Sequence, residues 1–137
     1  QNVSHFSLWC MMNAPLILGN DLRNMSDQVK SIVTNRNMIA INQDPLAKQA
    51  KRVRKGAVDV LAKPLADGSV AVCFFNKTSH AKSCKFDLNT LANDEYVAMQ
   101  KKSEYSLKEQ WSGQIATTDG KVNAVLEKHQ TKVFIVK

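Results

Sequence analysis

The sequence predicts an α/β segment over residues 1–50 followed by an all-β antiparallel sandwich over residues 51–137. Two observations support this division. Before residue 50, an apolar helix, an uninterrupted apolar run and an amphipathic helix follow one another, an order that is typical of α/β proteins. After Pro45, the apolar period changes to two and turn residues recur at regular intervals, as expected for an antiparallel sandwich.

The first predicted element is a helix over residues 5–13, whose apolar side chains cover nearly its whole circumference. We expect such a helix to be buried on most sides. Pro15 ends it, because proline disfavours helical geometry at the residue before it. Residues 16–18 then read as a parallel strand covered on both faces. A second, amphipathic helix begins at Ser26, a good N-cap, and extends to about Asn35.

The second part alternates apolar and polar residues, which indicates strands. Strands are predicted over 58–62, 70–74 and 84–88, with Asp67-Gly68 as the hairpin turn between the first two. The later candidates are short segments at similar spacing: 96–100, 103–111, 122–126 and 132–136. Six or seven strands of this kind favour a sandwich.

Three cysteines are too few for a disulfide scaffold, and their spacing is unlike that of a zinc site. Cys10 lies among apolar residues, so we expect a buried free thiol. Cys73 and Cys84 flank a predicted hairpin, and a turn centred near Thr78 and Ser79 makes them face each other. The sequence does not decide whether this pair forms a disulfide or remains as two free thiols.

The net charge is +7, and most of the excess lies after residue 50. Its densest run consists of Lys48, Lys51, Arg52, Arg54 and Lys55. Such a run suits phosphate backbones or sulfated polysaccharides, but no aromatic residues interleave the charges, which favours a solvated linker over nucleic-acid binding. No apolar run approaches the roughly 18 residues that span a bilayer, so a membrane segment is not expected.

Other chemical signatures are sparse. His5, His80 and His129 are scattered without the spacing of metal ligands, so neither a metal nor another cofactor is expected. Three Asn-x-Ser/Thr sequons occur, and the one at Asn76, in a predicted hairpin loop, is the one we favour for a glycan if the source is a secretory eukaryote.

Two separated runs carry a family resemblance. Residues 6–23 read FSLWCMMNAPLILGNDLR and residues 39–46 read IAINQDPL. Together they resemble the end of the catalytic barrel in glycoside hydrolase family 27, the α-galactosidases or melibiases. Shorter stretches at 72–78, 109–113 and 128–133 are similar to the C-terminal antiparallel sandwich of that family.

The resemblance implies that residues 1–50 are the last βα unit of an incomplete TIM (β/α)8 barrel. It also implies a parent enzyme, a retaining α-galactosidase that removes terminal α-galactosyl residues with two aspartates. Both aspartates belong upstream of Gln1 and have no counterpart here, so we expect this chain to be structural and inactive alone. The rest of the barrel is its implied partner.

The resemblance leaves the sugar of the parent's substrate open between galactose, N-acetylgalactosamine and arabinopyranose. It leaves the oligomeric state open as well. A secreted, lysosomal or vacuolar location is the expectation that the family suggests.

Asn20, Asp21 and Arg23 directly follow the predicted apolar strand, where barrel enzymes place reactive groups. A retaining glycosidase needs two carboxyl groups about 5–5.5 Å apart, and Asp21 has no obvious second carboxylate. We therefore predict that these three residues support the barrel rim and take no direct part in catalysis.

A hypothesis from another class is a stand-alone β-sandwich module that binds carbohydrate or a polyanion. Trp111, Tyr105 and the basic run would make its contacts. Aromatic side chains on an exposed face of the sandwich would favour this alternative.

Overall fold

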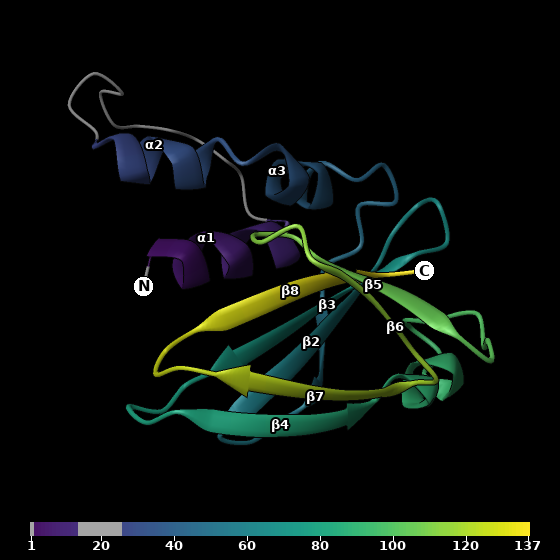
Figure 1. Cartoon of the computed structure of the whole chain (residues 1–137). Helices are drawn as coiled ribbons and strands as arrows, with labels where there is room; N and C mark the ends of the chain where they lie inside the picture. Colours follow the sequence, from purple (N-terminus) through teal and green to yellow (C-terminus); the bar gives the residue numbers. More distant parts are fainter. Residues whose placement is uncertain (1, 14–25) are drawn as a thin grey trace.

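The computed structural model describes residues 2–13 and 26–137 (Figure 1). Its helices are α1 (Asn2–Met11), α2 (Asp27–Val33) and α3 (Arg36–Asn42), with a 3₁₀ helix η2 (Leu88–Asn93) among the strands. The strands are β1 (Lys51–Arg54), β2 (Val58–Pro64), β3 (Val70–Asn76), β4 (Lys82–Asp87), β5 (Tyr105–Glu109), β6 (Ile115–Thr118), β7 (Lys121–Leu126) and β8 (Thr131–Val136).

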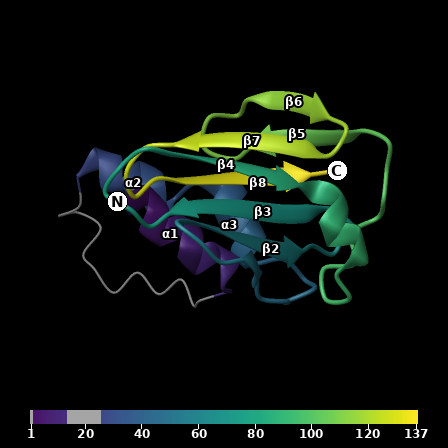
Figure 2. The same ribbon diagram turned by 90° about the horizontal axis from the view of Figure 1, so that it is seen from below.

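The strands form two antiparallel sheets. Six of them make one sheet in the order β1-β2-β3-β8-β5-β6, and β4 pairs with β7 in a second, two-stranded sheet. In Figure 1 the helices lie above the larger sheet and the smaller sheet lies below it. Figure 2, seen from below, shows β4 and β7 in front and the helices behind. The larger sheet is therefore the middle layer of three.

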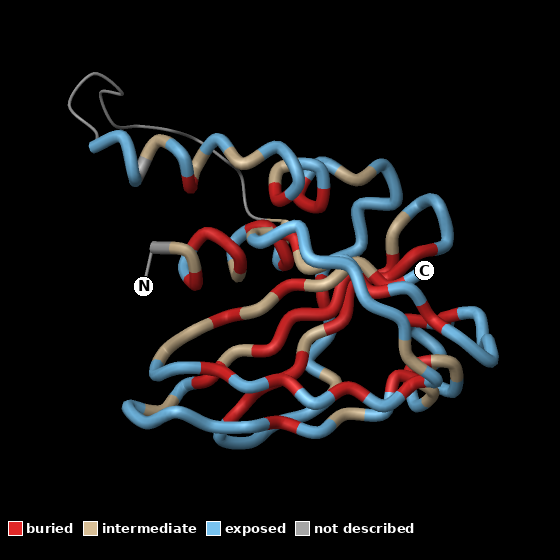
Figure 3. The backbone as a smooth tube through the Cα atoms, viewed as in Figure 1, coloured by how far each residue is buried: buried red, intermediate tan, exposed pale blue. Residues whose placement is uncertain are grey.

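This middle position explains the burial of β3, where six of seven residues are buried. Val70, Val72 and Phe74 belong to the core between the two sheets, and Ala71 and Cys73 belong to the cluster beneath the helices. Successive strand residues point to opposite faces, so a strand covered on both faces shows no polar alternation. Figure 3 shows this continuous burial through the central strands.

Several sequence predictions are confirmed. The helix predicted over 5–13 corresponds to α1, the Ser26 helix to α2, and the last two predicted strands to β7 and β8. The Asp67-Gly68 turn joins β2 to β3, with Gly68 at a φ of 88°, a conformation that glycine adopts without strain. The antiparallel sandwich is thus present as predicted, whereas the strand predicted over 16–18 lies outside the described residues.

The strand predicted over residues 96–100 is wrong, because this stretch forms turns and irregular backbone. The carboxylate Oδ1 of Asp94 accepts hydrogen bonds from the backbone N–H groups of Tyr96 (2.9 Å) and Val97 (3.0 Å). A side chain that captures nearby backbone donors competes with strand pairing. The apolar residues Val97 and Met99 are still buried, but as part of a loop that closes the end of the core.

The predicted hairpin between Cys73 and Cys84 is also wrong. β3 pairs with β2 and β8, whereas β4 pairs with β7 in the other sheet. Cys73 faces the helices and Cys84 faces the core between the sheets, and both thiols are free. The disulfide considered for this pair is therefore absent, because the polar stretch between them carries the chain from one sheet to the other.

Four elements were not predicted from the sequence: β1, β6, α3 and the 3₁₀ helix η2. β1 and β6 are four-residue strands at the two edges of the larger sheet, and their residues are mostly exposed. Exposed edge strands lack the apolar alternation by which strands are recognised. α3 begins at the N-cap Asn35, whose side-chain oxygen accepts a hydrogen bond from Met38 N at 3.0 Å. This capping signal was present in the sequence.

Candidate functional site

The candidate site is the interface between the helices and the larger sheet. Its apolar core joins residues from both sides: Phe6, Cys10 and Met11 from α1, Ile32 from α2, Met38 and Ile41 from α3, and Ala71, Cys73 and Val133 from the sheet. Each of these side chains is at most 8% exposed. The interface is therefore a second hydrophobic core, separate from the one inside the sandwich.

Hydrogen bonds fix α1 on the sheet at both of its ends. Near its beginning, Ser4 Oγ donates to the backbone oxygen of His129 at 2.6 Å. Just beyond its middle, Ser7 Oγ accepts from Trp111 Nε1 at 2.8 Å. At its end, the Met11 oxygen accepts from Ala50 N at 2.8 Å, which satisfies one of the carbonyls that a helix end leaves unpaired.

Glu109 positions Trp111 for this contact. Its carboxylate accepts from the backbone N–H groups of Trp111 (3.0 Å) and Ser112 (2.8 Å), and at 3.3 Å from that of Val133 in the adjacent β8. The turn after β5 is therefore held by a side chain of the same strand. The indole of Trp111 packs against the interface core as a result.

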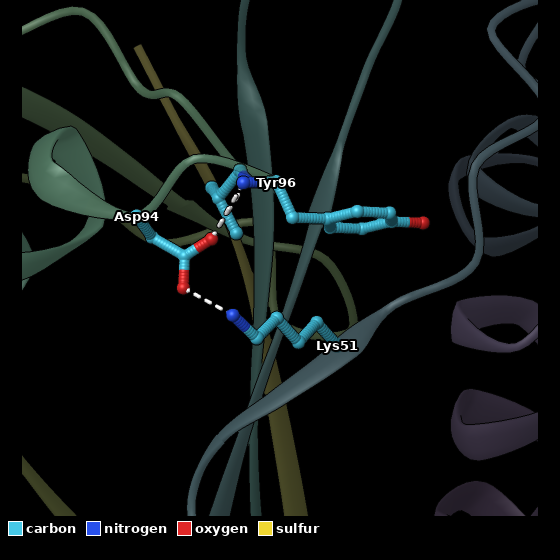
Figure 4. A network of polar contacts seen from close by, with 4 residues as sticks. Lys51, Asp94 and Tyr96 are labelled. Carbon is cyan, nitrogen blue, oxygen red and sulfur yellow. Dashed lines mark hydrogen bonds and ion pairs between the residues drawn. The ribbon is translucent and has the colours of Figure 1, made fainter.

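A second group of polar contacts fixes the connection between α3 and the sandwich (Figure 4). Lys51 Nζ lies 2.8 Å from Asp94 Oδ2, and the Tyr96 hydroxyl donates to the Gln49 oxygen at 2.6 Å. The Lys51 ammonium and the backbone N–H of Val97 hold the pKa of Asp94 below its usual value of 3.8. The connection is thus attached to the 94–97 loop and is not a free linker.

These contacts also account for most of the basic run. Lys48 lies over the Tyr96 ring, Lys51 pairs with Asp94, Arg52 lies 3.7 Å from Asp59, and Arg54 donates to the backbone oxygen of Lys85. Four of the five cations considered for polyanion binding thus have partners within the fold. The run serves to attach β1 and the preceding residues to the sandwich.

The aromatic residues of the alternative binding module are not on an exposed face. Tyr105 is 1% exposed, and its hydroxyl donates to Asn89 Oδ1 at 2.8 Å. Trp111 is half-buried in the helix–sheet interface. Both rings therefore have structural contacts, and neither supplies an exposed stacking platform.

The glycan predicted at Asn76 conflicts with the structure. Asn76 is fully buried, and its Nδ2 donates to the oxygens of His80 (2.8 Å), Glu127 (3.0 Å) and Leu126 (3.4 Å). A glycan is attached through this nitrogen. The prediction is wrong because the side chain joins the β3–β4 loop to the end of β7 and does not point into solvent.

The predicted barrel-rim residues Asn20, Asp21 and Arg23 lie outside the described residues. Within residues 2–13 and 26–137, no group of three or more His, Cys, Asp or Glu side chains could hold a metal ion. No helix in that part of the chain is long and apolar enough to cross a membrane. Burial raises the pKa of Cys10 and of Cys73 from 9.0 to about 12, which disfavours the reactive thiolate form of these two side chains.

Sequence reasoning missed Ser4, Ser7, Glu109 and Lys63 as interface residues. Lys63 shares the helix-facing side of β2 with Leu61, so period-two alternation places it on that side. The sequence could not show that helices cover that face. Serine and glutamate at the other positions carry no distinctive spacing.

Comparison with known proteins shows which family the two stretches of this chain resemble. The sequence model of the α-galactosidase C-terminal β-sandwich domain matches residues 55–136, and that of α-galactosidase A matches residues 1–44. The chain belongs to the α-galactosidase family.

Relatives in this family align with almost the whole chain. α-Galactosidase A of Cellvibrio japonicus is 37% identical over 136 residues, covering 96% of this chain and 34% of the relative. The α-galactosidase of Oryza sativa is 31% identical over 134 residues, covering 97% of this chain and 31% of the relative. The chain thus spans about a third of the length of these relatives.

The fold is shared with solved α-galactosidases as well. The crystal structure of α-galactosidase I from Mortierella vinacea superposes with a TM-score of 0.87 and 21% identity. The superposition covers 98% of this chain and 34% of that one. The helices and the sandwich therefore correspond together to one part of a larger α-galactosidase fold.

Proposed function

We propose that this chain is the carboxyl-terminal part of a retaining α-galactosidase. Residues 1–50 complete the catalytic (β/α)8 barrel, and residues 51–137 form the sandwich that supports it. The parent enzyme removes terminal α-galactosyl residues, and the rest of the barrel supplies both catalytic aspartates. The chain itself contributes structure and no reacting group.

The observation that carries this proposal is the incomplete covering of α1. Phe6, Cys10 and Met11 are buried against the sheet, whereas Trp9 of the same helix is 42% exposed and Met12, which directly follows the helix, is 39% exposed. His5 stacks edge-on against Trp9 at 5.1 Å, next to them. A helix that is apolar all round is stable when neighbours cover it on every side. In a complete barrel, adjacent helices and strands supply the missing neighbours.

The fraction of each relative's length that aligns with this chain also supports the proposal. Both curated relatives are called α-galactosidases, and the chain aligns with only about a third of each. A retaining mechanism requires a carboxylate nucleophile and a carboxylic acid about 5–5.5 Å apart. Several carboxylates of the described part already have structural roles, including Asp59, Asp94 and Glu109. This supports an origin of the catalytic pair elsewhere in the parent.

The experiment is a chimera. The segment of the Cellvibrio japonicus enzyme that aligns with this chain is replaced by residues 1–137, and hydrolysis of 4-nitrophenyl α-galactoside is measured. We expect turnover by the chimera and none by residues 1–137 alone. A chimera without residues 51–137 is the control for the supporting role of the sandwich.

Two outcomes would contradict the proposal. Turnover by residues 1–137 alone would show that the chain carries a complete catalytic pair. A chimera that folds cooperatively but does not hydrolyse the galactoside would show that these residues cannot complete an α-galactosidase. A secreted, lysosomal or vacuolar location of the parent is part of the proposal and is tested by fractionation of the source cells.

A further inference from the structure

A groove of about 930 Å³ opens where three segments of the fold meet. They are the beginning of α1, the turn between β5 and β6 over residues 110–114, and the turn between β7 and β8 over residues 127–130. The large apolar side chains that line the groove are Val3, Leu107, Trp111, Ile115 and Phe134.

The described part of the chain does not fill this groove. Ile115 is 70% exposed, more than any other large apolar side chain that the structure describes. Trp111 and Phe134 are each only partly buried. Apolar side chains gathered in a hollow that is open to water commonly mark an interaction surface. The groove is therefore a candidate contact surface.

The sheet edge at this groove, β6, supports the same interpretation. Edge strands that face water usually carry charges, which oppose pairing with another chain. The opposite edge of the larger sheet follows this rule, because β1 carries three cations in four residues. β6 has the sequence IATT, without a charge, and its residues are mostly exposed. An uncharged edge is expected where another part of a protein covers it.

α1 begins at this groove. Ser4 Oγ donates to the His129 oxygen at 2.6 Å, and Thr131 Oγ1 donates to Ser4 Oγ at 3.3 Å. Val3 and Ser4 both line the groove and directly follow Asn2, the first residue of α1. Figures 1 and 2 both show α1 beginning beside the turn between β7 and β8. A polypeptide joined to Asn2 therefore starts within reach of the groove.

The family matches indicate where the rest of the parent lies. Residues 55–136 match the C-terminal sandwich domain of α-galactosidases, and the chain aligns with about a third of each curated relative. A C-terminal domain follows the other parts of its protein, so most of the remaining length precedes residue 1 in such a parent. That part reaches α1 at its amino-terminal end, where the groove lies.

Residues 14–25 of this chain are a less direct candidate. They leave from the opposite end of α1, a helix of ten residues that is about 15 Å long. They lead into α2, and no described residue of α2 or α3 lines the groove. A segment that precedes Asn2 has no such distance to cross. This comparison favours the preceding segment as the occupant.

We propose that this groove receives the segment of the parent α-galactosidase that leads into α1. The segment packs apolar side chains against Ile115, Trp111 and Phe134 and covers the uncharged edge of β6. It joins the barrel to the sandwich at the amino-terminal end of α1, whereas the hydrogen bond from Ala50 N to the Met11 oxygen fixes the other end. The inference rests on the proposed function and concerns contact between the two parts.

The polar groups beside the apolar lining favour a protein segment over a small ligand. The Glu109 carboxylate already accepts from the backbone N–H groups of Trp111 and Ser112, and Trp111 Nε1 donates to Ser7 Oγ. Small-ligand sites depend on a few polar groups that are available to fix the ligand's orientation. These groups are occupied within the chain, so the groove offers mainly apolar contact.

Cysteine footprinting tests the contact. The three native thiols are buried, so Ile115→Cys introduces an accessible thiol whose reaction with iodoacetamide can be followed by peptide mapping. In residues 1–137 alone, Ile115→Cys should react at close to its rate in urea. In the chimera described above, it should react at least about tenfold more slowly, because it reacts only when the covering segment opens.

Val125→Cys is the matched control. Val125 is a β-branched strand residue like Ile115 and is 55% exposed, but it lies on β7 and does not line the groove. Val125→Cys should react rapidly in both proteins. The buried Cys73 should stay unmodified in both, which verifies that each protein is folded.

A photo-crosslink identifies the occupant directly and does not require residues 1–137 to fold alone. In the chimera, p-benzoylphenylalanine replaces Ile115, and mass spectrometry identifies the peptide to which it becomes joined. We expect a link to the part of the chimera that precedes α1. A link to residues 14–25, or to a second copy of the protein, would contradict the proposal.

The inference is overturned if Ile115→Cys reacts equally fast in the chimera and in residues 1–137 alone. Protection in both proteins also overturns it. Such protection would identify residues 14–25 as the occupant if it is independent of protein concentration, and a second copy if it rises with concentration. The footprint requires no turnover, so a folded but inactive chimera contradicts the proposed function while the labelling rates still decide the contact.

Discussion

The indole Nε1 of Trp111 donates a 2.8 Å hydrogen bond to Oγ of Ser7, a residue 104 positions away in the sequence. Ser7 is fully buried on the sheet-facing side of α1, and Trp111 lies in the turn after β5. This contact joins the helical segment, which matches α-galactosidase A, to the sandwich domain. The contribution of this hydrogen bond to the attachment of the two parts can be tested by substituting the two side chains.

We expect Ser7→Ala and Trp111→Phe to be coupled. Each substitution removes one partner of the hydrogen bond, so each should cost about 1 kcal/mol or more, and the double variant should cost less than their sum. The coupling energy from urea unfolding should be about 0.5–1.5 kcal/mol. Exposed Ser106→Ala in β5 is the control and should be additive with Trp111→Phe.

Asp94 should make the protein less stable in acid. Its pKa in the folded state lies below the usual 3.8, so its stabilising effect is complete above that value and is lost as pH falls through the folded pKa. We expect Asp94→Asn to cost about 1 kcal/mol at pH 7 and progressively less below about pH 4. Urea midpoints at pH 7 and pH 3 measure this difference.

The neighbouring exposed residue Glu95 offers a control for the charge change. Glu95→Gln should shift the urea midpoint little at either pH. An Asp94→Asn effect of the same size at both pH values would show that the ion pair with Lys51 is not its origin.

The three cysteines should behave as buried free thiols. Cys10 and Cys73 are fully buried and Cys84 is 7% exposed. We expect iodoacetamide to add to none of them within minutes under native conditions, and to all three in urea without a reductant. Intact mass spectrometry counts the adducts. A single adduct in urea would contradict the free thiols and would support a disulfide between Cys73 and Cys84.

Asn76 should carry no glycan in the folded protein. When the chain is secreted from a eukaryotic host, Thr78→Val, which destroys the sequon, should have the same glycan content as Thr78→Ser, which keeps it. A loss of mass specific to Thr78→Val would contradict the buried position of Asn76. Asn76→Ala should cost about 1–3 kcal/mol, because it removes the amide that donates to the backbone oxygens of Leu126 and Glu127.

Gly120 should tolerate alanine poorly. Its φ is 130°, and an added Cβ would collide with the side-chain amide of Asn89, which cannot withdraw freely because its Oδ1 accepts from Tyr105. We expect Gly120→Ala to cost about 3 kcal/mol and Gly113→Ala about 1 kcal/mol, since Gly113 has a φ of 76° and open space around it. Equal costs in thermal unfolding would contradict the clash.

Local patterns in the sequence were enough to predict α1, α2, β2, β3, β7 and β8. Their apolar residues repeat with the period of a helix or of a strand, and both periods follow from backbone geometry alone. The Asp67-Gly68 turn could be predicted for the same reason, because a positive φ favours glycine. Two separated sequence runs also indicated the family, which the family comparison confirmed.

Tertiary structure decided which strands are neighbours. Cys73 and Cys84 are only eleven positions apart, yet they face different cores because β4 leaves the larger sheet and pairs with β7. Pairing between distant strands depends on the packing of the whole domain, which short-range patterns do not encode. The same reason explains why Asn76, in a loop by its sequence, is buried.

The sequence by itself therefore determined the family and the main helices and strands. Only the tertiary structure decided the three-layer arrangement, in which helices cover the sheet face that carries Leu61 and the buried Lys63. A strand pattern shows that its two faces differ, but it does not show what covers each face. That covering decides whether a polar side chain is hydrated or paired within the chain.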